Sequence, residues 1–435
     1  MKNGKEKVAI LTTFMEFLPG YSLTGIVKDQ AKMFALYGHE VHLFVNEKYH
    51  GEIFSDDVVL EKKIPFTHLV DYMSIKDISE EHKKTVVDTS NMLVKQLKDF
   101  DVVLTHDYIF TGWNLPYGQA CITASKELPH LSWFHWVHSI PNGNRDYWKI
   151  RAMGEQHKII FPNNTDRLHV AEQYSGGIEN VRVIHHIKDI RLWFDFCNDT
   201  LDIIEKVPAI MEADVVQLLP ASVDRLSAKR VKEVMAIFSC IKKMGRSVCL
   251  VIANQWATGK KQKEDVEHYK NIATNLGLIV NKEVVFTSDL KKEYEVGVSS
   301  RIIRELFQCS NLFIFPTREE SFGLVVPEAS LAGGVLLVLN KSLEQQREIA
   351  GNNALYFSFG SYQNNFDKPD ADWPAYLWDI AIIILGRFRE NESIQAKTFC
   401  RQKYNLDYLY QFEYIPVFAE ARFNRVDEKK GLKIV

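Results

Sequence analysis

Residues 313 to 339 read Phe-Ile-Phe-Pro-Thr-Arg-Glu-Glu-Ser-Phe-Gly-Leu-Val-Val-Pro-Glu-Ala-Ser-Leu-Ala-Gly-Gly-Val-Leu-Leu-Val-Leu. The apolar start predicts a strand that ends in a short loop over Thr317 to Ser321, and Pro327 suits the first turn of a helix beginning near Leu324. The first N–H groups of a helix have no partner within it, so the loop is expected to face an anion. A strand, loop and helix in this order are typical of α/β folds, which bind ligands at the carboxyl ends of their strands.

Two carboxylates flank this turn. Glu320 lies in the loop, and Glu328 follows after seven intervening residues, about one turn into the predicted helix. Both side chains can therefore point into one cleft, where carboxylates would accept hydrogen bonds from hydroxyl groups. Gly323, which has no Cβ, would let backbone N–H groups approach a sugar or a phosphate. Taken alone, a loop carboxylate such as Glu320 is more often solvated or paired with a neighbour such as Arg318.

The spacing of Glu320 and Glu328 around Phe-Gly resembles the Glu-x7-Glu signature of retaining family-4 glycosyltransferases of the GT-B fold. The resemblance implies that Glu320 holds hydroxyls of a donor sugar and that Glu328 holds the nucleotide ribose. It also implies that the residues of the turn meet the sugar and the diphosphate: Ser321, Phe322, Gly323, Leu324 and Val325.

A second loop carries two cations. After the strand-like run at residues 215 to 220, the chain places Arg225 and Lys229 ahead of a predicted helix. Two cations held in place would stabilise the negative charge that develops on a leaving diphosphate. Family-4 enzymes carry an Arg and a Lys on this loop, but their usual Gly before the Arg is Asp224 here, and Arg230 could replace Lys229.

The first half of the chain offers candidates for the opposite side of a cleft. Gly20 belongs to a loop that resembles the family's glycine loop, which approaches donor phosphate and acceptor. His135 stands where the family has a histidine that reaches the donor sugar, and His138 is the runner-up. His106 with Asp107 could line the acceptor side of the cleft, or these residues could have a capping role.

Two further histidines take the place of the family's hinge motif. His185 and His186 depart from the Asn-Gly form of that motif. A structural role is therefore expected for both, rather than a catalytic one.

Length and composition favour a two-domain soluble enzyme. The chain has 435 residues, 46% hydrophobic and 25% charged, with a formal net charge of −3. It is too long for one hydrophobic core, and it has no apolar run long enough to span a membrane. Its first residues resemble no signal peptide, so a cytoplasmic location is expected. Six scattered cysteines without matched histidines predict no zinc site, and no metal is expected.

Strand-like and helix-like segments alternate along the whole chain, as in an α/β protein with parallel sheets. The predicted architecture is GT-B, with two Rossmann-like domains. The expected segments are an N-terminal acceptor-side domain over 1–190, a connection over 191–209, a nucleotide-sugar-binding domain over 210–404, and a C-terminal helix over 405–435 that packs back on the first domain.

The expected function is transfer of a hexose-type sugar from a UDP- or GDP-linked donor to a hydroxyl acceptor, with retention at the anomeric carbon and without a cofactor. Three alternatives stay open. One is a phage-type glycosyltransferase acting on a modified DNA base, in which Trp133, Trp136, Tyr147 and Trp148 could stack on the flipped base. The acidic excess of the first domain disfavours nucleic acid. Another is a protein that binds a sugar nucleotide without turnover. The third is a different GT-B enzyme, such as a sugar-nucleotide epimerase, which would form product from the donor alone.

Overall fold

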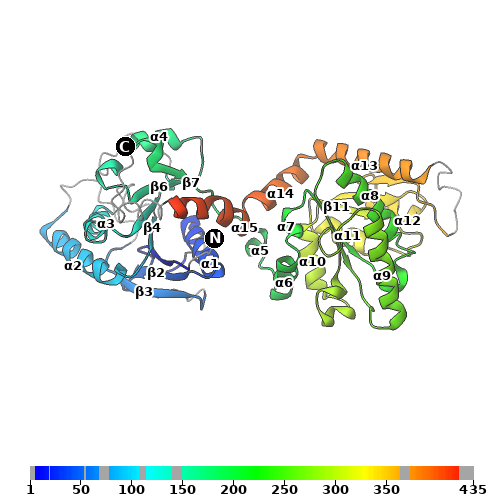
Figure 1. The fold of residues 1–435 in the computed structure, drawn as a ribbon, viewed down its shortest axis with the longest axis horizontal. Helices are drawn as coiled ribbons and strands as arrows, with labels where there is room; N and C mark the ends of the chain where they lie inside the picture. The colour runs from blue at the N-terminus through cyan, green and yellow to red at the C-terminus, as the bar shows by residue number, and fades with distance from the viewer. Residues whose placement is uncertain are drawn as a thin grey trace. The chain divides into compact units, whose positions relative to one another are not determined.

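The computed structural model describes residues 5–18, 20–52, 55–67, 78–106, 114–139, 149–362 and 372–420. The chain forms two compact units, each with its own parallel strands (Figure 1). Unit 1 comprises Met1–Ile187 and Leu406–Val435, and unit 2 comprises Lys188–Asn405.

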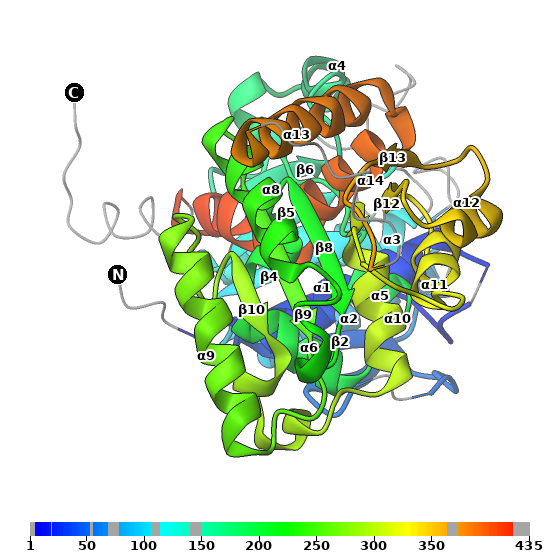
Figure 2. The same ribbon diagram turned by 90° about the vertical axis from the view of Figure 1, so that its right-hand side faces the viewer.

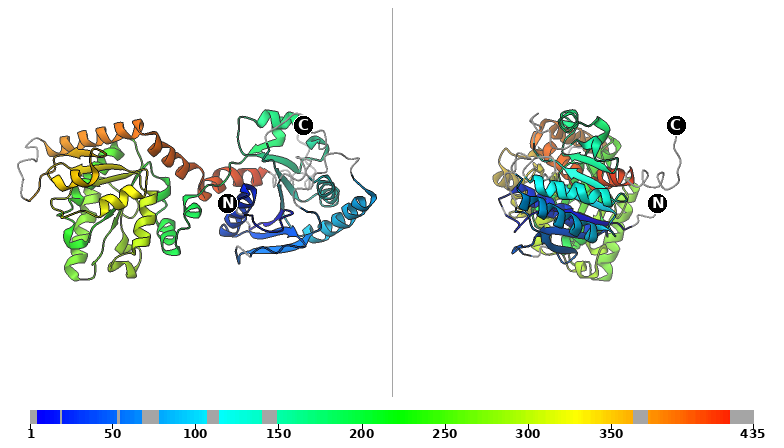
Figure 3. Two further views of the ribbon diagram at one scale, coloured as in Figure 1. Left: turned by 180° about the vertical axis from the view of Figure 1, so that it is seen from behind. Right: turned by 90° about the vertical axis from the view of Figure 1, so that its left-hand side faces the viewer.

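Unit 1 is built on a seven-stranded sheet in the order β3-β2-β1-β4-β5-β6-β7. Every pair of neighbouring strands is parallel, with Ile10 of β1 opposite Leu43 of β2 and Leu104 of β4. The strands face the viewer in the right-hand view of Figure 3. Their bounds are β1 Lys7–Leu11, β2 Glu40–Asn46, β3 Val58–Ile64, β4 Val102–His106, β5 Ser132–Trp136, β6 His157–Phe161 and β7 Val181–Val183.

Helices cover both faces of this sheet, because its strands are apolar on both sides. Ala9 and Leu11 of β1 share one core with Leu93 and Tyr117 of the helices α2 and α3. On the other face, α1 packs against β2 and β3. The described helical elements of unit 1 before the C-terminal segment are α1 Ser22–Leu36, α2 Glu80–Leu97, α3 Leu115–Glu127, the short turns η2 Ile150–Ala152 and η3 Ile178–Asn180, and α4 Arg167–Gln173.

The C-terminal segment consists of α15 (Leu406–Leu409), the π-helical turn η7 (Tyr410–Tyr414) and further helical turns to Glu420. It packs on unit 1 through aromatic rings and polar side chains. The Gln30 amide donates to the Tyr414 hydroxyl at 3.0 Å. The Phe418 ring stacks on both Phe34 and Phe134. The segment therefore completes the core on the α1 face of the sheet.

Unit 2 contains two three-stranded parallel sheets, in the orders β10-β9-β8 and β11-β12-β13. In Figure 2, which faces unit 2, β10 lies beside the long helix α9, and contacts between these two elements agree with the view. The strand bounds are β8 Val215–Pro220, β9 Val248–Ala253, β10 Val284–Phe286, β11 Leu312–Phe315, β12 Leu336–Asn340 and β13 Leu355–Phe357.

The buried side chain of Gln217 joins the two sheets between β8 and β11. Its Nε2 donates to the carbonyl of Ile314, and its Oε1 accepts from the N–H of Ile314, both at 2.9 Å. The N–H of Asn311 also donates to the carbonyl of Val216 at 3.0 Å. The six strands thus run as 10-9-8-11-12-13, and the chain order reverses between β8 and β11.

The helices of unit 2 pack on these sheets, and together with the short turns they account for the alternation predicted from the sequence. Their bounds are α5 Ile190–Trp193, α6 Asn198–Lys206, α7 Ala209–Glu212, η4 Val223–Arg225, α8 Val231–Lys243, α9 Lys260–Asn275, η5 Thr287–Asp289, η6 Lys292–Glu295, α10 Ser300–Cys309, α11 Val325–Leu331, α12 Glu344–Ala350, α13 Trp373–Glu390 and α14 Glu392–Lys403. The predicted α/β class, with a parallel sheet in each half, is confirmed.

The segment 191–209, expected as a connection, forms α5, α6 and the start of α7. Phe196, Ile203 and Val207 of this stretch are buried in the core of unit 2. Its apolar residues recur at helical spacing because one face of each helix is buried there. The division between the units falls instead after Ile187 and again after Asn405.

Candidate functional site

The candidate site of unit 2 lies in two loops that leave the neighbouring strands β8 and β11 at their carboxyl ends. The chain order reverses between these strands, and open α/β sheets bind ligands at such a reversal. The candidate cations lie in the loop after β8, and the candidate carboxylates follow β11.

The loop after β8 orients two successive cations differently. The N–H of Lys229 donates to the carbonyl of Arg225 at 2.8 Å, which closes a turn. Arg230 then takes a left-handed conformation with φ 54°. Its side chain is 2% exposed, and its Nη1 donates to the Glu233 carboxylate at 2.8 Å. Arg230 is thus held by α8, whereas Lys229 faces the second loop.

The loop after β11 is fixed by side chains bonded to its backbone. The amide of Asn340 donates to the carbonyl of Thr317 at 2.8 Å, and the hydroxyl of Thr317 donates to the carbonyl of Glu319 at 2.8 Å. The amide of Gln345 donates to the carbonyl of Glu320 at 2.6 Å. These bonds fix the backbone that carries the side chains of Glu319 and Glu320.

The two loops are joined by hydrogen bonds to the carbonyl of Ala228 and by two ion pairs. The N–H of Arg318 donates to the carbonyl of Ala228 at 2.8 Å. Arg225 Nη2 lies 2.9 Å from Glu319 Oε1, and Lys229 Nζ pairs with Glu320 Oε2. The structure therefore brings Arg225, Lys229 and Glu320 together, as the sequence suggested.

The two ion pairs differ in exposure. The side chains of Lys229 and Glu320 are 13% and 17% exposed, whereas those of Arg225 and Glu319 are 40% and 53% exposed. Lys229 Nζ also lies 4.7 Å from the centroid of the Phe315 ring. The inner pair is therefore shielded from water, while the outer pair is solvated and weak.

Glu328 is not brought into this cluster. It lies on the exposed face of α11, and among the described residues its carboxylate has no hydrogen bond and no ion pair. Partial burial of the carboxyl raises its pKa. Both carboxylate oxygens of Glu328 are thus available to accept hydrogen bonds from hydroxyl groups.

The turn between Glu320 and α11 is open to solvent. Ser321 is exposed, Phe322 and Leu324 are 53% and 66% exposed, and Val325 is half-buried. Apolar side chains held at the surface beside charged groups suit contact with a ligand.

Gly323 sits at the one position of this turn that requires a glycine. Its φ is +86°, and a Cβ built there would lie 3.1 Å from Cγ of Glu320. We expect Gly323→Ala to lower the free energy of unfolding by about 1 kcal/mol from backbone strain, and by a further amount from this contact. Gly245→Ala is the matched control, because Gly245 has φ +84° with nothing within 4 Å.

Urea unfolding of both variants checks this prediction. Equal losses of stability would show that Gly323 serves only the backbone conformation. A larger loss in Gly323→Ala, with weaker ligand binding than in Gly245→Ala, would show that its missing Cβ makes room for Glu320.

The candidates of unit 1 are placed differently from one another. Gly20 is exposed in the loop after β1, and a Cβ there would meet nothing within 4 Å. His135 is fully buried in β5, with its Nδ1 2.8 Å from the Thr105 hydroxyl and its Nε2 2.9 Å from His157 Nδ1. Neither ring nitrogen faces solvent, so the predicted contact of His135 with a donor sugar gains no support from this geometry.

A chain of imidazoles lies at the carboxyl edge of the unit 1 sheet. His106 Nδ1 is 3.0 Å from His138 Nε2, and His138 Nδ1 is 3.4 Å from His186 Nε2. His106 Nε2 lies 3.0 Å from the side-chain amide oxygen Oε1 of Gln30. The sequence suggested these histidines one by one. Their contact could not be foreseen, because the three residues lie at or just beyond the ends of three different strands.

Burial keeps these histidines neutral. It lowers the pKa of His106 and of His157 to about 3, and it lowers the pKa of His135, His138 and His186 as well. Neighbouring imidazoles lower the pKa further in each case except His157. His185 instead lies against the Glu413 carboxylate of the C-terminal segment, with 2.8 Å between Nδ1 and Oε1.

The prediction that an aromatic cluster stacks on a nucleobase is wrong for two of the four residues. Trp133 and Trp136 are at most 1% exposed, and their rings pack on His157 and Tyr414 inside unit 1. The aromatic spacing marked buried strand positions rather than a surface. Two other members, Tyr147 and Trp148, lie outside the described residues, as does Asp107.

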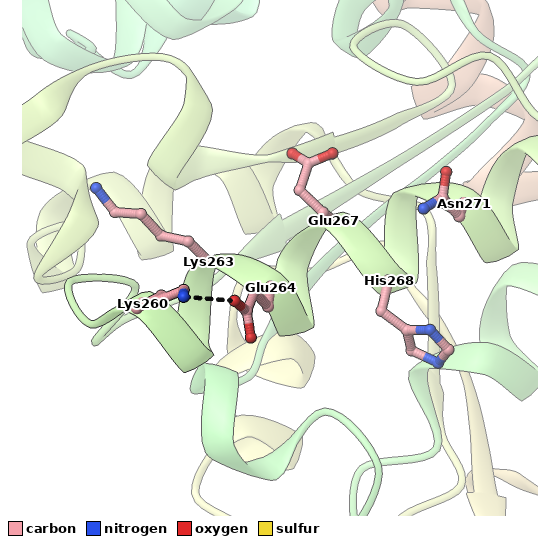
Figure 4. A pocket seen from close by; sticks show the side chains of 6 residues that line it. All are labelled: Lys260, Lys263, Glu264, Glu267, His268 and Asn271. Atoms are coloured by element: carbon pink, nitrogen blue, oxygen red, sulfur yellow. Dashed lines mark ion pairs between the residues drawn. The ribbon is translucent and has the colours of Figure 1, made fainter.

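A shallow hollow on unit 2 is lined by residues of α9 alone, as Figure 4 shows. No residue of the two loops contributes to it. Its charged side chains belong to a solvated helix face, with Lys260 and Glu264 paired four residues apart. The lining residues are Lys260, Lys263, Glu264, Glu267, His268 and Asn271.

The described part of the chain offers neither a cluster of metal-ligating side chains nor a membrane-spanning helix. Its His, Cys, Asp and Glu side chains form no group of three or more that could hold a metal ion. None of its helices is long and apolar enough to cross a lipid bilayer.

No protein-family model matches this sequence, and no curated protein matches it either. Solved structures resemble the whole chain at low identity. A glycosyltransferase from Rickettsia africae ESF-5 is 14% identical, covering 96% of this chain and 98% of that one, with a TM-score of 0.37. Anabaena HepE in complex with UDP is 14% identical, covering 95% and 100%, with a TM-score of 0.31. An alpha,alpha-trehalose-phosphate synthase (UDP-forming) from Burkholderia xenovorans in complex with glucose-6-phosphate is 10% identical, covering 95% and 100%, with a TM-score of 0.34.

Proposed function

We propose that unit 2 binds a nucleoside-diphosphate sugar at the carboxyl edge between β8 and β11, and that the protein transfers the sugar to a hydroxyl acceptor. The observation that carries this proposal is the pairing of two cations with two carboxylates across the loops after these strands. Such a site offers cations to a diphosphate and the Glu320 carboxylate to sugar hydroxyls, at the place where an open α/β sheet binds ligands. It also agrees with the Glu-x7-Glu resemblance to family-4 enzymes of the GT-B fold.

Arg225 and Lys229 would bind the diphosphate and stabilise the charge that grows on it as the glycosidic bond breaks. Arg225 is half-exposed and presents a planar fork of N–H donors, which suits phosphate oxygens. Lys229 supplies a single shielded charge. Without either cation, part of the negative charge that develops on the diphosphate would be stabilised by water alone.

Glu320 would accept hydrogen bonds from sugar hydroxyls, and Glu328 from the ribose hydroxyls. The exposed turn between them would meet the donor through Ser321, Phe322, Gly323, Leu324 and Val325. Hydrogen bonds donated to an ionised carboxylate are about twice as strong as those between neutral groups, so Glu320 can fix the orientation of the sugar ring.

The proposed reaction retains the anomeric configuration and requires no protein nucleophile and no metal. The bond from the anomeric carbon to the phosphate oxygen breaks, and the bond to the acceptor oxygen forms on the same face. The acceptor's proton passes to the departing phosphate oxygen, so the products are the glycoside and a nucleoside diphosphate. The protein's part is positioning and electrostatic stabilisation.

Release of nucleoside diphosphate tests the proposal. The protein is incubated with radiolabelled UDP-, GDP- and ADP-sugars, with and without a pool of hydroxyl-bearing acceptors. We expect acceptor-dependent release from at least one donor, and a labelled product with the donor's anomeric configuration. Binding without release would indicate a sugar-nucleotide sensor, and an isomerised sugar nucleotide formed from donor alone would indicate an epimerase. Either result would contradict transfer.

A further inference from the structure

Glu319 stands outside the carboxylate pair to which the proposed function assigns donor contacts, yet it holds one of the two cations that this function needs. Its Oε1 lies 2.9 Å from Arg225 Nη2. A guanidinium that donates these N–H groups to a carboxylate cannot donate the same ones to a phosphate. The contact seen in the structure therefore competes with the contact that diphosphate binding requires.

The Arg225–Glu319 pair is built to exchange. Both side chains are at least 40% exposed, and solvated pairs contribute little. The backbone of Glu319 is fixed separately, because its carbonyl accepts from the Thr317 hydroxyl at 2.8 Å. The carboxylate can thus swing away from Arg225 by side-chain rotation alone, without moving the loop.

The inner pair lacks this freedom. Lys229 and Glu320 are at most 17% exposed, and Lys229 also lies over the Phe315 ring. Separating these two side chains would leave both charges unpaired at a position that is shielded from water. The two ion pairs therefore have different roles. The Lys229–Glu320 pair holds the loops together, whereas the Arg225–Glu319 pair can break.

We propose, on the basis of the proposed function, that Glu319 is an exchangeable counter-ion of Arg225. It competes with the diphosphate, weakens the binding of the nucleoside-diphosphate product and so speeds its release. Glu319 determines how tightly the site holds a diphosphate and makes no contact with the sugar.

Calorimetric titration of UDP, GDP and ADP into the wild-type protein and Glu319→Gln tests this role. The glutamine keeps the shape and removes the charge that holds Arg225. We expect about five-fold tighter binding of the preferred nucleoside diphosphate, the scale of one solvated ion pair. The gain is expected to shrink in about 0.5 M salt, because exposed charges are screened.

Asp224→Asn is the matched control. Asp224 is exposed beside Arg225 in the same loop, but no ion pair joins it to any described residue. Its replacement by asparagine removes one negative charge, as Glu319→Gln does. We expect less than about a two-fold change in affinity from this variant, as for other weak exposed charges. Unfolding midpoints of both variants are measured alongside, to show that the fold is retained.

Unchanged or weaker binding by Glu319→Gln would overturn the role of Glu319. So would an equal gain in Glu319→Gln and Asp224→Asn, because general charge removal would then explain both. If the wild-type protein and both variants bind none of the three nucleoside diphosphates, the proposed function itself fails.

Discussion

Glu320→Gln is expected to lower the rate of sugar transfer by ~10² or more, which is the scale of losing one preorganised electrostatic contact at a reacting centre. The glutamine keeps the size of the side chain but not its charge. It would hold sugar hydroxyls with weaker neutral hydrogen bonds, and it would leave Lys229, which is 13% exposed, without its carboxylate. Initial rates of nucleoside-diphosphate release, with donor and acceptor saturating, measure the effect.

Glu344→Gln is the control for this variant. Glu344 is an exposed carboxylate on α12 that has no hydrogen bond or ion pair with another described residue. It is expected to keep the wild-type rate. Near wild-type turnover in Glu320→Gln, with the donor shown to be consumed, would remove Glu320 from the reaction.

Arg225→Ala is expected to reduce transfer on the same scale of ~10², because it takes one cation from the departing diphosphate. Its only ion pair among the described residues, with Glu319, is solvated, so the free energy of unfolding should change little. A loss of activity without a loss of stability separates the catalytic role from a structural one. A loss of both together would contradict it.

The second large effect is expected in acid. Unit 1 should lose stability steeply as the pH falls below about 6.5, the ordinary pKa of histidine. Five of its histidines have lowered pKa values because burial disfavours the charged imidazole: His106, His135, His138, His157 and His186. In the unfolded chain all five would take up protons near pH 6.5, whereas the folded chain keeps them neutral.

The sign of the effect follows from proton uptake. Below pH 6.5 the unfolded state binds more protons than the folded state, so the free energy of unfolding falls as the pH falls. For His106 and His157 the window extends down to their folded pKa of about 3. Each such histidine costs roughly 1 kcal/mol per pH unit, so together they can remove several kcal/mol between pH 6.5 and 5. That is a large part of the stability of an ordinary domain.

Urea unfolding followed by tryptophan fluorescence at pH 5 to 8 measures this slope. His157→Gln should make it shallower by roughly 1 kcal/mol per pH unit, because one buried imidazole is removed. His169→Gln, whose histidine is 71% exposed in the same unit, should leave the slope unchanged. Equal slopes in the wild type and His157→Gln would mean that His157 takes up protons in the folded state.

The alternation of strands and helices could be read from the sequence because most strands are buried on both faces and appear as continuous apolar runs. Val8 to Leu11 and Val248 to Ala253 are of this kind, and both form strands. β3 and β13 are harder to recognise from the sequence. Both are edge strands, and β3 carries charged residues such as Glu61 and Lys62 because one side of it meets solvent.

The candidate site could be predicted only in part. The motif placed Glu320 beside a helix start, and the loop after β8 carried Arg225 and Lys229. The pairing of these residues depends on how two loops about ninety residues apart are aligned, and Gln217 sets that alignment from inside the sheet. The burial of His135 likewise depends on its neighbours in three strands, which no local pattern reports.

The most direct test of the central claim is calorimetric titration of nucleoside-diphosphate sugars into the wild-type protein and two double variants. Arg225→Ala with Lys229→Ala removes both cations of the proposed site. Lys260→Ala with Lys263→Ala removes two cations from α9 of the same unit. We expect the wild type and the α9 variant to bind a donor equally, and the site variant to bind it at least ~10² more weakly. Equal binding by all three proteins, or binding by none, would contradict a diphosphate site between β8 and β11.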